Sequence, residues 1–114
     1  LSFGTTVYGS YAIENSIELV LLKRVEEVTS FMSISDTEGL TGLEGLESLT
    51  TVGGGLVIQD NDSLLTLDGL SSLSSGGGNL SIINNDNLCQ SYVDVLTSRV
   101  SSANVYSYGN KDGC

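Results

Sequence analysis

The chain of 114 residues has no histidine, proline or tryptophan, and only two cysteines. Four Lys and Arg residues stand against 14 Asp and Glu residues, giving a net charge of −10. Such a surface repels phosphate groups, so we expect no nucleic acid among its partners. The longest apolar run, Ile17 to Leu22, includes Glu18 and is far shorter than the roughly 20 residues of a membrane span, so we predict no membrane insertion.

The same shortages leave little material for catalysis. A nucleophile or general base needs a partner that poises it, and without His the candidates reduce to carboxylates and two lysines in polar turns, Lys23 and Lys111. Two cysteines without His are too few for a zinc site. No carboxylate pair shows the raised-pKa partner that a glycosidase requires. We therefore predict that the protein is not an enzyme and has no cofactor.

The chain does contain an internal repeat. Segments that begin at Met32, Leu56 and Leu80 superimpose at an offset of 24 residues, within the range of leucine-rich repeats. Each unit reads apolar-x-Ile, a polar turn, a run of leucines spaced by three, and a glycine-rich return. A unit that begins at Tyr11 follows the same pattern with a connection three residues shorter.

This repeat predicts a mainly β fold. The alternation at the start of each unit is typical of a strand, and the leucines three apart suit a 3₁₀-like arc. One unit alone cannot bury its apolar positions, so the units must stack. We predict a single domain, residues 1–114: a right-handed parallel β-solenoid with leucine-rich coils of about 24 residues over 1–88, and a helix-strand cap over 89–114.

Stacking places equivalent residues in columns. The Ile column (Ile13, Ile34, Ile58, Ile82) and the Leu column (Leu19, Leu40, Leu64, Leu88) are expected in the core. Short polar residues form a corner column, Ser16, Thr37, Asn61 and Asn85, in which each side chain is expected to bond the backbone of its own turn and of the next coil. We interpret this column as structural.

Two glycine runs, Gly53–Gly55 and Gly76–Gly78, invite comparison with a phosphate-binding loop. No Lys-Ser or Lys-Thr pair follows either run and the surroundings are acidic, so we interpret both as corners that need positive φ.

The predicted cap begins after Leu88. Ser91 and Asp94 have the spacing of a capping box, and Tyr92, Leu96 and Val100 recur every four residues, which indicates an amphipathic helix ending near Arg99. Residues 105–108 suit one more strand. Cys89 and Cys114 are 25 residues apart, equivalent points of adjacent coils, so we predict a disulfide that stabilises the cap by about 2 to 4 kcal/mol. A disulfide indicates an extracellular or cell-surface location.

Acidic residues form a predicted ridge beside the corner column. Its members are Asp36 and Asp60, in line with Asn84, and Glu38, Asp62 and Asp86. We interpret the ridge as a solvated surface; the alternative is calcium bound between coils through hard oxygen ligands, although no segment matches a known calcium loop.

The repeat resembles a known family. The unit Gly55-Leu56-Val57-Ile58-Gln59-Asp60-Asn61, continued by Leu64, Leu67, Gly69, Leu70 and Leu73, resembles repeats of receptor L domains and related leucine-rich surface proteins, over about residues 7–88. The segments Asn84 to Cys89 and Asn110 to Cys114 are similar to the terminal cap of secreted members. The resemblance implies a domain that helps to bind protein ligands, but it places no ligand-binding residue in this chain, which has fewer coils and cysteines than a full receptor domain.

Two functions follow from these features. The first is a binding module for a protein or glycan, using the strand face or the acidic ridge, with Tyr106 and Tyr108 as candidate aromatic contacts. The second is a structural subunit: the chain begins mid-unit at Leu1-Ser2-Phe3, as a processed chain or a fragment, and an uncapped N-terminal coil that met another copy head-to-tail would build a filament. Of two Asn-x-Ser sequons, at Asn61 and Asn79, only Asn79 is expected to be accessible to a glycan.

Overall fold

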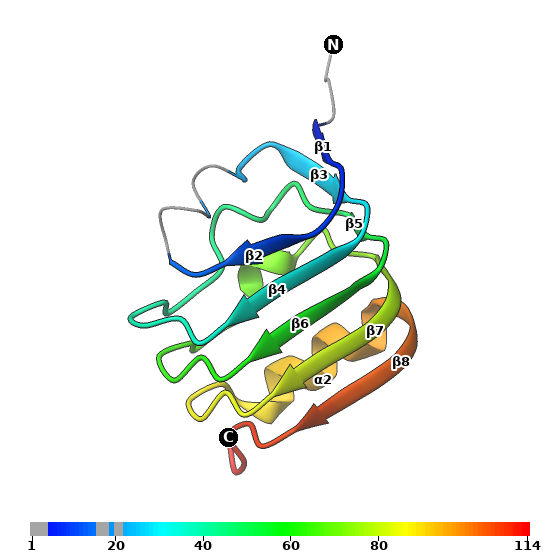
Figure 1. Cartoon of the computed structure of the whole chain (residues 1–114). Helices are drawn as coiled ribbons and strands as arrows, with labels where there is room; N and C mark the ends of the chain where they lie inside the picture. Colours follow the sequence, from blue (N-terminus) through cyan, green and yellow to red (C-terminus); the bar gives the residue numbers. More distant parts are fainter. Residues whose placement is uncertain (1–4, 16–18, 20–21) are drawn as a thin grey trace.

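The computed structural model describes residues 5–15, 19 and 22–114 (Figure 1). In these residues eight strands form one sheet in which every pairing is parallel. The strands are β1 (Thr5–Val7), β2 (Tyr11–Ile13), β3 (Val25–Val28), β4 (Phe31–Ser35), β5 (Thr51–Val52), β6 (Gly55–Gln59), β7 (Ser75–Ile83) and β8 (Ser101–Tyr108). A 3₁₀ helix, η1 (Asp68–Leu70), and an α-helix, α2 (Gln90–Arg99), complete the fold. Ser16 and the segment Leu1-Ser2-Phe3 lie outside the described residues.

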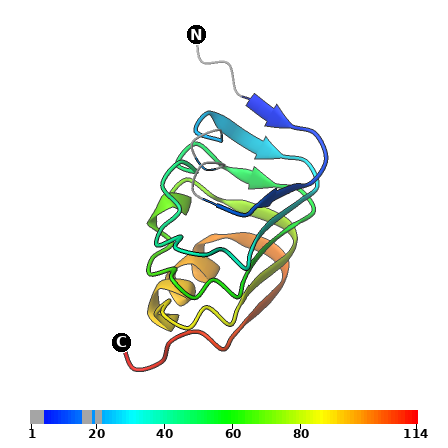
Figure 2. The same ribbon diagram turned by 60° about the vertical axis from the view of Figure 1, so that its left-hand side comes forward.

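Each repeat contributes two strands. The predicted strands stack as β2, β4, β6 and the second half of β7, with Met32, Leu56 and Leu80 in register. The return segments of the repeats form a second stack, β1, β3, β5 and the first half of β7, which the sequence pattern did not predict. Figure 2 shows the two stacks joined at a bend, with β8 closing both below β7. The all-parallel sheet is compatible with the predicted solenoid.

The leucine arcs close each repeat at the back of the sheet. They are built from backbone bonds three residues apart: Leu46 N–H donates to Leu43 O at 3.2 Å, and Leu49 N–H donates to Leu46 O at 3.0 Å. The arc of the next repeat includes η1, as the 3₁₀-like spacing predicted. The leucines of both arcs are buried and belong to one apolar core with the Ile column.

A ladder of side-chain amides runs through the corner at the carboxyl ends of β4, β6 and β7. Thr37, Asn61, Asn85 and Asn110 are its members, and all four are buried. Asn85 Oδ1 accepts from the backbone N–H of Asn61 at 3.1 Å and from Asn61 Nδ2 at 3.0 Å, and Asn110 Oδ1 repeats both contacts with Asn85. Asn61 Nδ2 also donates to Ile34 O at 2.9 Å. Each amide therefore ties consecutive coils together.

Replacement of Asn85 by alanine tests this ladder. It leaves the buried N–H of Asn61, Ile58 O and one acceptor site of Asn110 without their partner, so we expect the free energy of unfolding to fall by about 2 to 4 kcal/mol. The matched control is Asp86→Ala, an exposed neighbour, with an expected change within about 0.5 kcal/mol. Urea unfolding measures both, and equal small losses would show that the ladder is dispensable.

The glycine runs do not serve as the positive-φ corners that the sequence suggested. Of the six glycines only Gly55 has positive φ, at 133°, and Gly76–Gly78 lie inside β7. Except at Gly76, their role is close approach: a Cβ on Gly77 would lie 2.5 Å from Gly53 O, and one on Gly78 would meet Gly54 O. The backbones of adjacent coils touch at this bend, so a side chain is excluded by contact rather than by conformation.

Substitution of Gly78 and of Gly76 tests whether close contact requires glycine in this run. Gly78→Ala forces a methyl group against the backbone of the coil above, and we expect a loss of about 1 to 3 kcal/mol in unfolding free energy. Gly76→Ala meets no atom closer than Val100 Cγ1 at 3.9 Å, so stability should stay the same or rise by up to about 1 kcal/mol. Thermal unfolding of both variants is the measurement. A large loss in Gly76→Ala would contradict the assignment.

The cap contains the predicted helix and strand, with two corrections. The N-cap of α2 is Cys89, without a side-chain capping bond, so the Ser91 and Asp94 capping box is wrong. The first N–H of the helix is instead bonded across the chain, from Gln90 to Lys111 O at 2.8 Å. The buried face is Val93, Leu96 and Val100, whereas Tyr92 is 48% exposed. Leu96 and Val100 thus lie on the buried face as predicted, and Val93 takes the place expected of Tyr92.

The two cysteines form a disulfide. Cys89 and Cys114 have Cα atoms 5.8 Å apart, within the range that the bond requires. Cys89 precedes α2 and Cys114 follows β8, so the bond closes a loop that contains the whole cap. No free cysteine remains.

Candidate functional site

The stack of β2, β4, β6 and the second half of β7 presents a flat outward face, which β8 extends. Met32, Ile34, Leu56, Ile58, Leu80 and Ile82 point inward and are fully buried, so the alternate residues point outward. On β8 the outward positions are Tyr106, beside Ser81, and Tyr108, beside Ile83. These two candidate residues thus lie on one face, as the sequence pattern allowed.

The outward face becomes apolar toward its last coil. Tyr106 is 47% exposed and Tyr108 is 60% exposed, and the partly exposed Ile83 lies beside them. We call Ile83, Tyr106 and Tyr108 the tyrosine patch. At these positions the upper coils carry Ser33 and Ser35 on β4 and Val57 and Gln59 on β6, none of them aromatic. The exposed Phe31 lies at the opposite end of β4. Two exposed aromatic rings on a rigid parallel sheet form a surface suited to protein contact.

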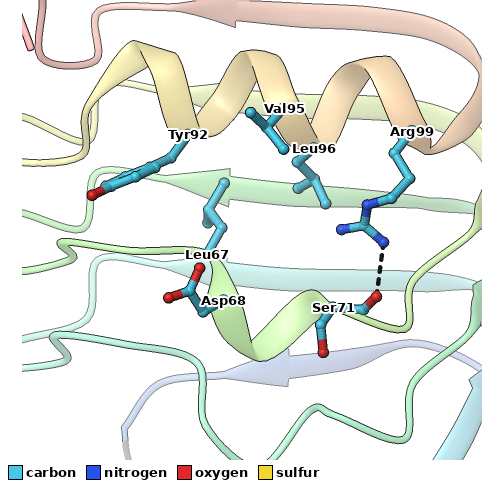
Figure 3. A pocket seen from close by; sticks show the side chains of 7 residues that line it. All are labelled: Leu67, Asp68, Ser71, Tyr92, Val95, Leu96 and Arg99. Atoms are coloured by element: carbon cyan, nitrogen blue, oxygen red, sulfur yellow. Dashed lines mark hydrogen bonds between the residues drawn. The ribbon is translucent and has the colours of Figure 1, made fainter.

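A second surface feature is a groove between α2 and the η1 turn (Figure 3). Its volume is about 350 Å³, and its lining is Leu67, Asp68, Ser71, Tyr92, Val95, Leu96 and Arg99. Figure 3 shows Tyr92 and Arg99 extending from α2 toward the turn, one at each end of the groove. The floor is apolar. The repeat pattern does not predict this groove, because it depends on how α2 packs on the preceding coil.

Arg99 binds the main chain of that coil. Its Nη1 donates to Ser71 O at 3.0 Å and to Leu73 O at 2.8 Å, and its Nη2 donates to Leu70 O at 3.0 Å. Leu70 is the last residue of η1, and its carbonyl also accepts from Leu73 N–H at 3.1 Å; Ser71 and Leu73 follow η1. Arg99 lies in the last turn of α2, as predicted, and its hydrogen bonds go to the preceding coil. The groove therefore has a structural cation already engaged at one end.

The acidic ridge has a conformational cause. Asp36, Asp60 and Asn84 adopt left-handed backbone conformations, with φ of 54°, 58° and 56°, and Gly109 follows in the same column at 71°. Asp, Asn and Gly are the residues that tolerate this region. Glu38, Asp62 and Asp86 are exposed beside them. The residues that the structure describes include no group of three or more carboxylate, thiol or imidazole side chains placed to hold a metal ion.

The ladder ends on Gln90, whose role was not predicted from the sequence. Asn110 Nδ2 donates to Ile82 O at 2.9 Å and to Gln90 Oε1 at 3.1 Å. Gln90 thus takes the place that the amide of a further coil would occupy. The spacing of 25 residues between Asn85 and Asn110 places Asn110 in the ladder. Gln90, however, lies on α2, outside the repeat, so no spacing indicates it.

No helix among the described residues is long and apolar enough to cross a membrane.

One of the comparisons with known proteins gives a match. Searches of curated proteins and of solved structures return no match. The family model described as Receptor L domain matches residues 5–100, which is most of the chain and includes both strand stacks and α2. This chain belongs to the receptor L domain family.

Proposed function

We propose that the protein is a non-enzymatic extracellular module that binds a protein through the tyrosine patch. The observation that carries the proposal is the pair of exposed rings, Tyr106 and Tyr108, on the outward face of the strands. The receptor L domain is a ligand-binding module of extracellular type, which supports this class of function. The disulfide is consistent with an oxidising location.

The scaffold supports the choice of this face. We propose that the repeats wind as a right-handed solenoid, so that the outward positions form a flat array held by the amide ladder and the leucine core beneath. Side chains at these outward positions are not part of the core, so they can vary to match a partner. The groove beside α2 is the weaker candidate because the guanidinium of Arg99 is already bound to three backbone carbonyls.

The test is a binding screen with matched tyrosine variants. Wild-type protein is immobilised and probed with a panel of recombinant extracellular proteins from the source organism by surface plasmon resonance. Tyr106→Ser with Tyr108→Ser should weaken a specific interaction at least tenfold, because exposed aromatic anchors dominate such interfaces. Tyr92→Ser removes an equally exposed ring from the helix and should leave the affinity unchanged. Loss of binding in Tyr92→Ser alone would transfer the function to the groove.

The alternative, a subunit of an extracellular filament, has one observation in its favour. Among the described residues β8 pairs with β7 alone and no strand pairs with its outer edge, and edges of this kind add further strands. Against it, Gln90 occupies the terminal position of the amide ladder, so a further coil would have to displace it.

Light scattering over a range of concentrations separates the two functions. We expect the mass of one chain at every concentration, with and without reductant, because the ladder is closed at its C-terminal end by Gln90. Growth of the mass with concentration would favour the filament. The matched variant is Gln90→Ala, which opens the end of the ladder; if assembly begins only in this variant, Gln90 acts as a stop.

A further inference from the structure

We propose that Asn79 is an N-glycosylation site and that its glycan stands on the same outward face as the tyrosine patch. The chain has two Asn-x-Ser sequons, Asn61-Asp62-Ser63 and Asn79-Leu80-Ser81. Both asparagines belong to the repeat and lie close to strands, so the sequence motif does not distinguish them. Their hydrogen bonds do.

The amide of Asn61 is fully used inside the protein. The residue is completely buried, and its two Nδ2 hydrogens go to Ile34 O at 2.9 Å and to Asn85 Oδ1 at 3.0 Å. A sugar on this nitrogen would remove one of these bonds and would need space inside the corner of the coil. A chain glycosylated at Asn61 therefore cannot form the ladder.

The amide of Asn79 is available. The residue is exposed on β7, and its Oδ1 accepts from Asn104 Nδ2 at 3.1 Å. Its Nδ2 makes no hydrogen bond within the described part of the chain, so attachment of a sugar breaks no contact there. The residue beside it on β6 is Gly55, and the two residues before it are Gly77 and Gly78, so few side chains crowd the site.

The modification has a defined chemistry. The amide nitrogen of Asn79 attacks the anomeric carbon of a lipid-diphosphate-linked oligosaccharide. The new carbon–nitrogen bond forms as the carbon–oxygen bond to the diphosphate breaks; the lipid diphosphate leaves, and the amide loses one proton. The remaining N–H and the carbonyl oxygen are retained, so the Asn104 contact survives. The reaction belongs to the secretory route, where the Cys89–Cys114 disulfide also forms.

The position of the glycan deepens the proposed function, on which this step rests. Ile83 lies four residues after Asn79 on the same strand, about 13 Å further along at the usual strand rise. The glycan thus covers the beginning of the strands, and the tyrosine patch lies at their ends. A protein partner would approach from the carboxyl ends, with the glycan as its boundary.

The test is intact mass of the full chain secreted from yeast, before and after endoglycosidase H. We expect one oligomannose glycan on the wild type, none on Asn79→Gln or Ser81→Ala, and an unchanged glycan on Ser63→Ala, which removes the buried sequon. Secretion of folded wild type without a glycan would overturn the proposal, as would a glycan that persists in Asn79→Gln and disappears in Ser63→Ala. Two glycan variants are used so that poor secretion of one does not decide the result.

A second readout separates this inference from the proposed function. The mass result concerns Asn79 alone and stands whether or not the tyrosine patch binds a protein. If a binder is found in the tyrosine screen, trimming of the glycan should change its affinity less than tenfold, because the patch lies beyond the sugar. If a protein partner bound only after removal of the Asn79 glycan, the glycosylation site would still be confirmed. The proposed position of the glycan at the edge of the binding surface would then be wrong.

Discussion

The structure depends on the need to satisfy buried backbone groups at the corner of each repeat. When parallel strands turn inward together, the N–H and C=O groups at the turn leave the ladder of strand pairing and lose access to water, and each unpaired group costs roughly 1 to 3 kcal/mol. One polar side chain per described coil meets this need. Thr37 donates to the asparagine of the next coil, and the amides of Asn61 and Asn85 both accept and donate between coils. The left-handed residue before each of these three, Asp36 or Asp60 or Asn84, sets the direction of the chain.

The two bends of the coil solve different problems. At the amide corner, side chains fill the space between turns and hold adjacent coils in register. At the glycine bend, adjacent backbones approach so closely that side chains are excluded. Both bends are fixed by residues that face inward or lack side chains, so the fold does not depend on the side chains at outward positions of the strands. This freedom is what allows two tyrosines to stand exposed on β8.

Much of this was predictable from the sequence because the repeat is strict. The offset of 24 residues fixes the register of Ile34, Ile58 and Ile82, and from it the sheet and the core follow. The two cysteines are 25 residues apart, which still places them on adjacent coils. The second strand stack was missed because a strand as short as Thr51–Val52 shows no alternation. Gln90 and the contacts of Arg99 were missed because they join the cap to the repeats, and no periodicity relates the two.

The central claim is that the amide ladder holds the coils together, and hydrogen exchange of its side chains tests it most directly. The Nδ2 protons of Asn61, Asn85 and Asn110 are resolved in an NMR spectrum of labelled protein. We predict that they exchange as slowly as the most protected backbone amides of β6 and β7, through global unfolding. Exchange at the rate of an exposed amide such as Asn79, while β6 and β7 stay protected, would show that the coils hold without the ladder.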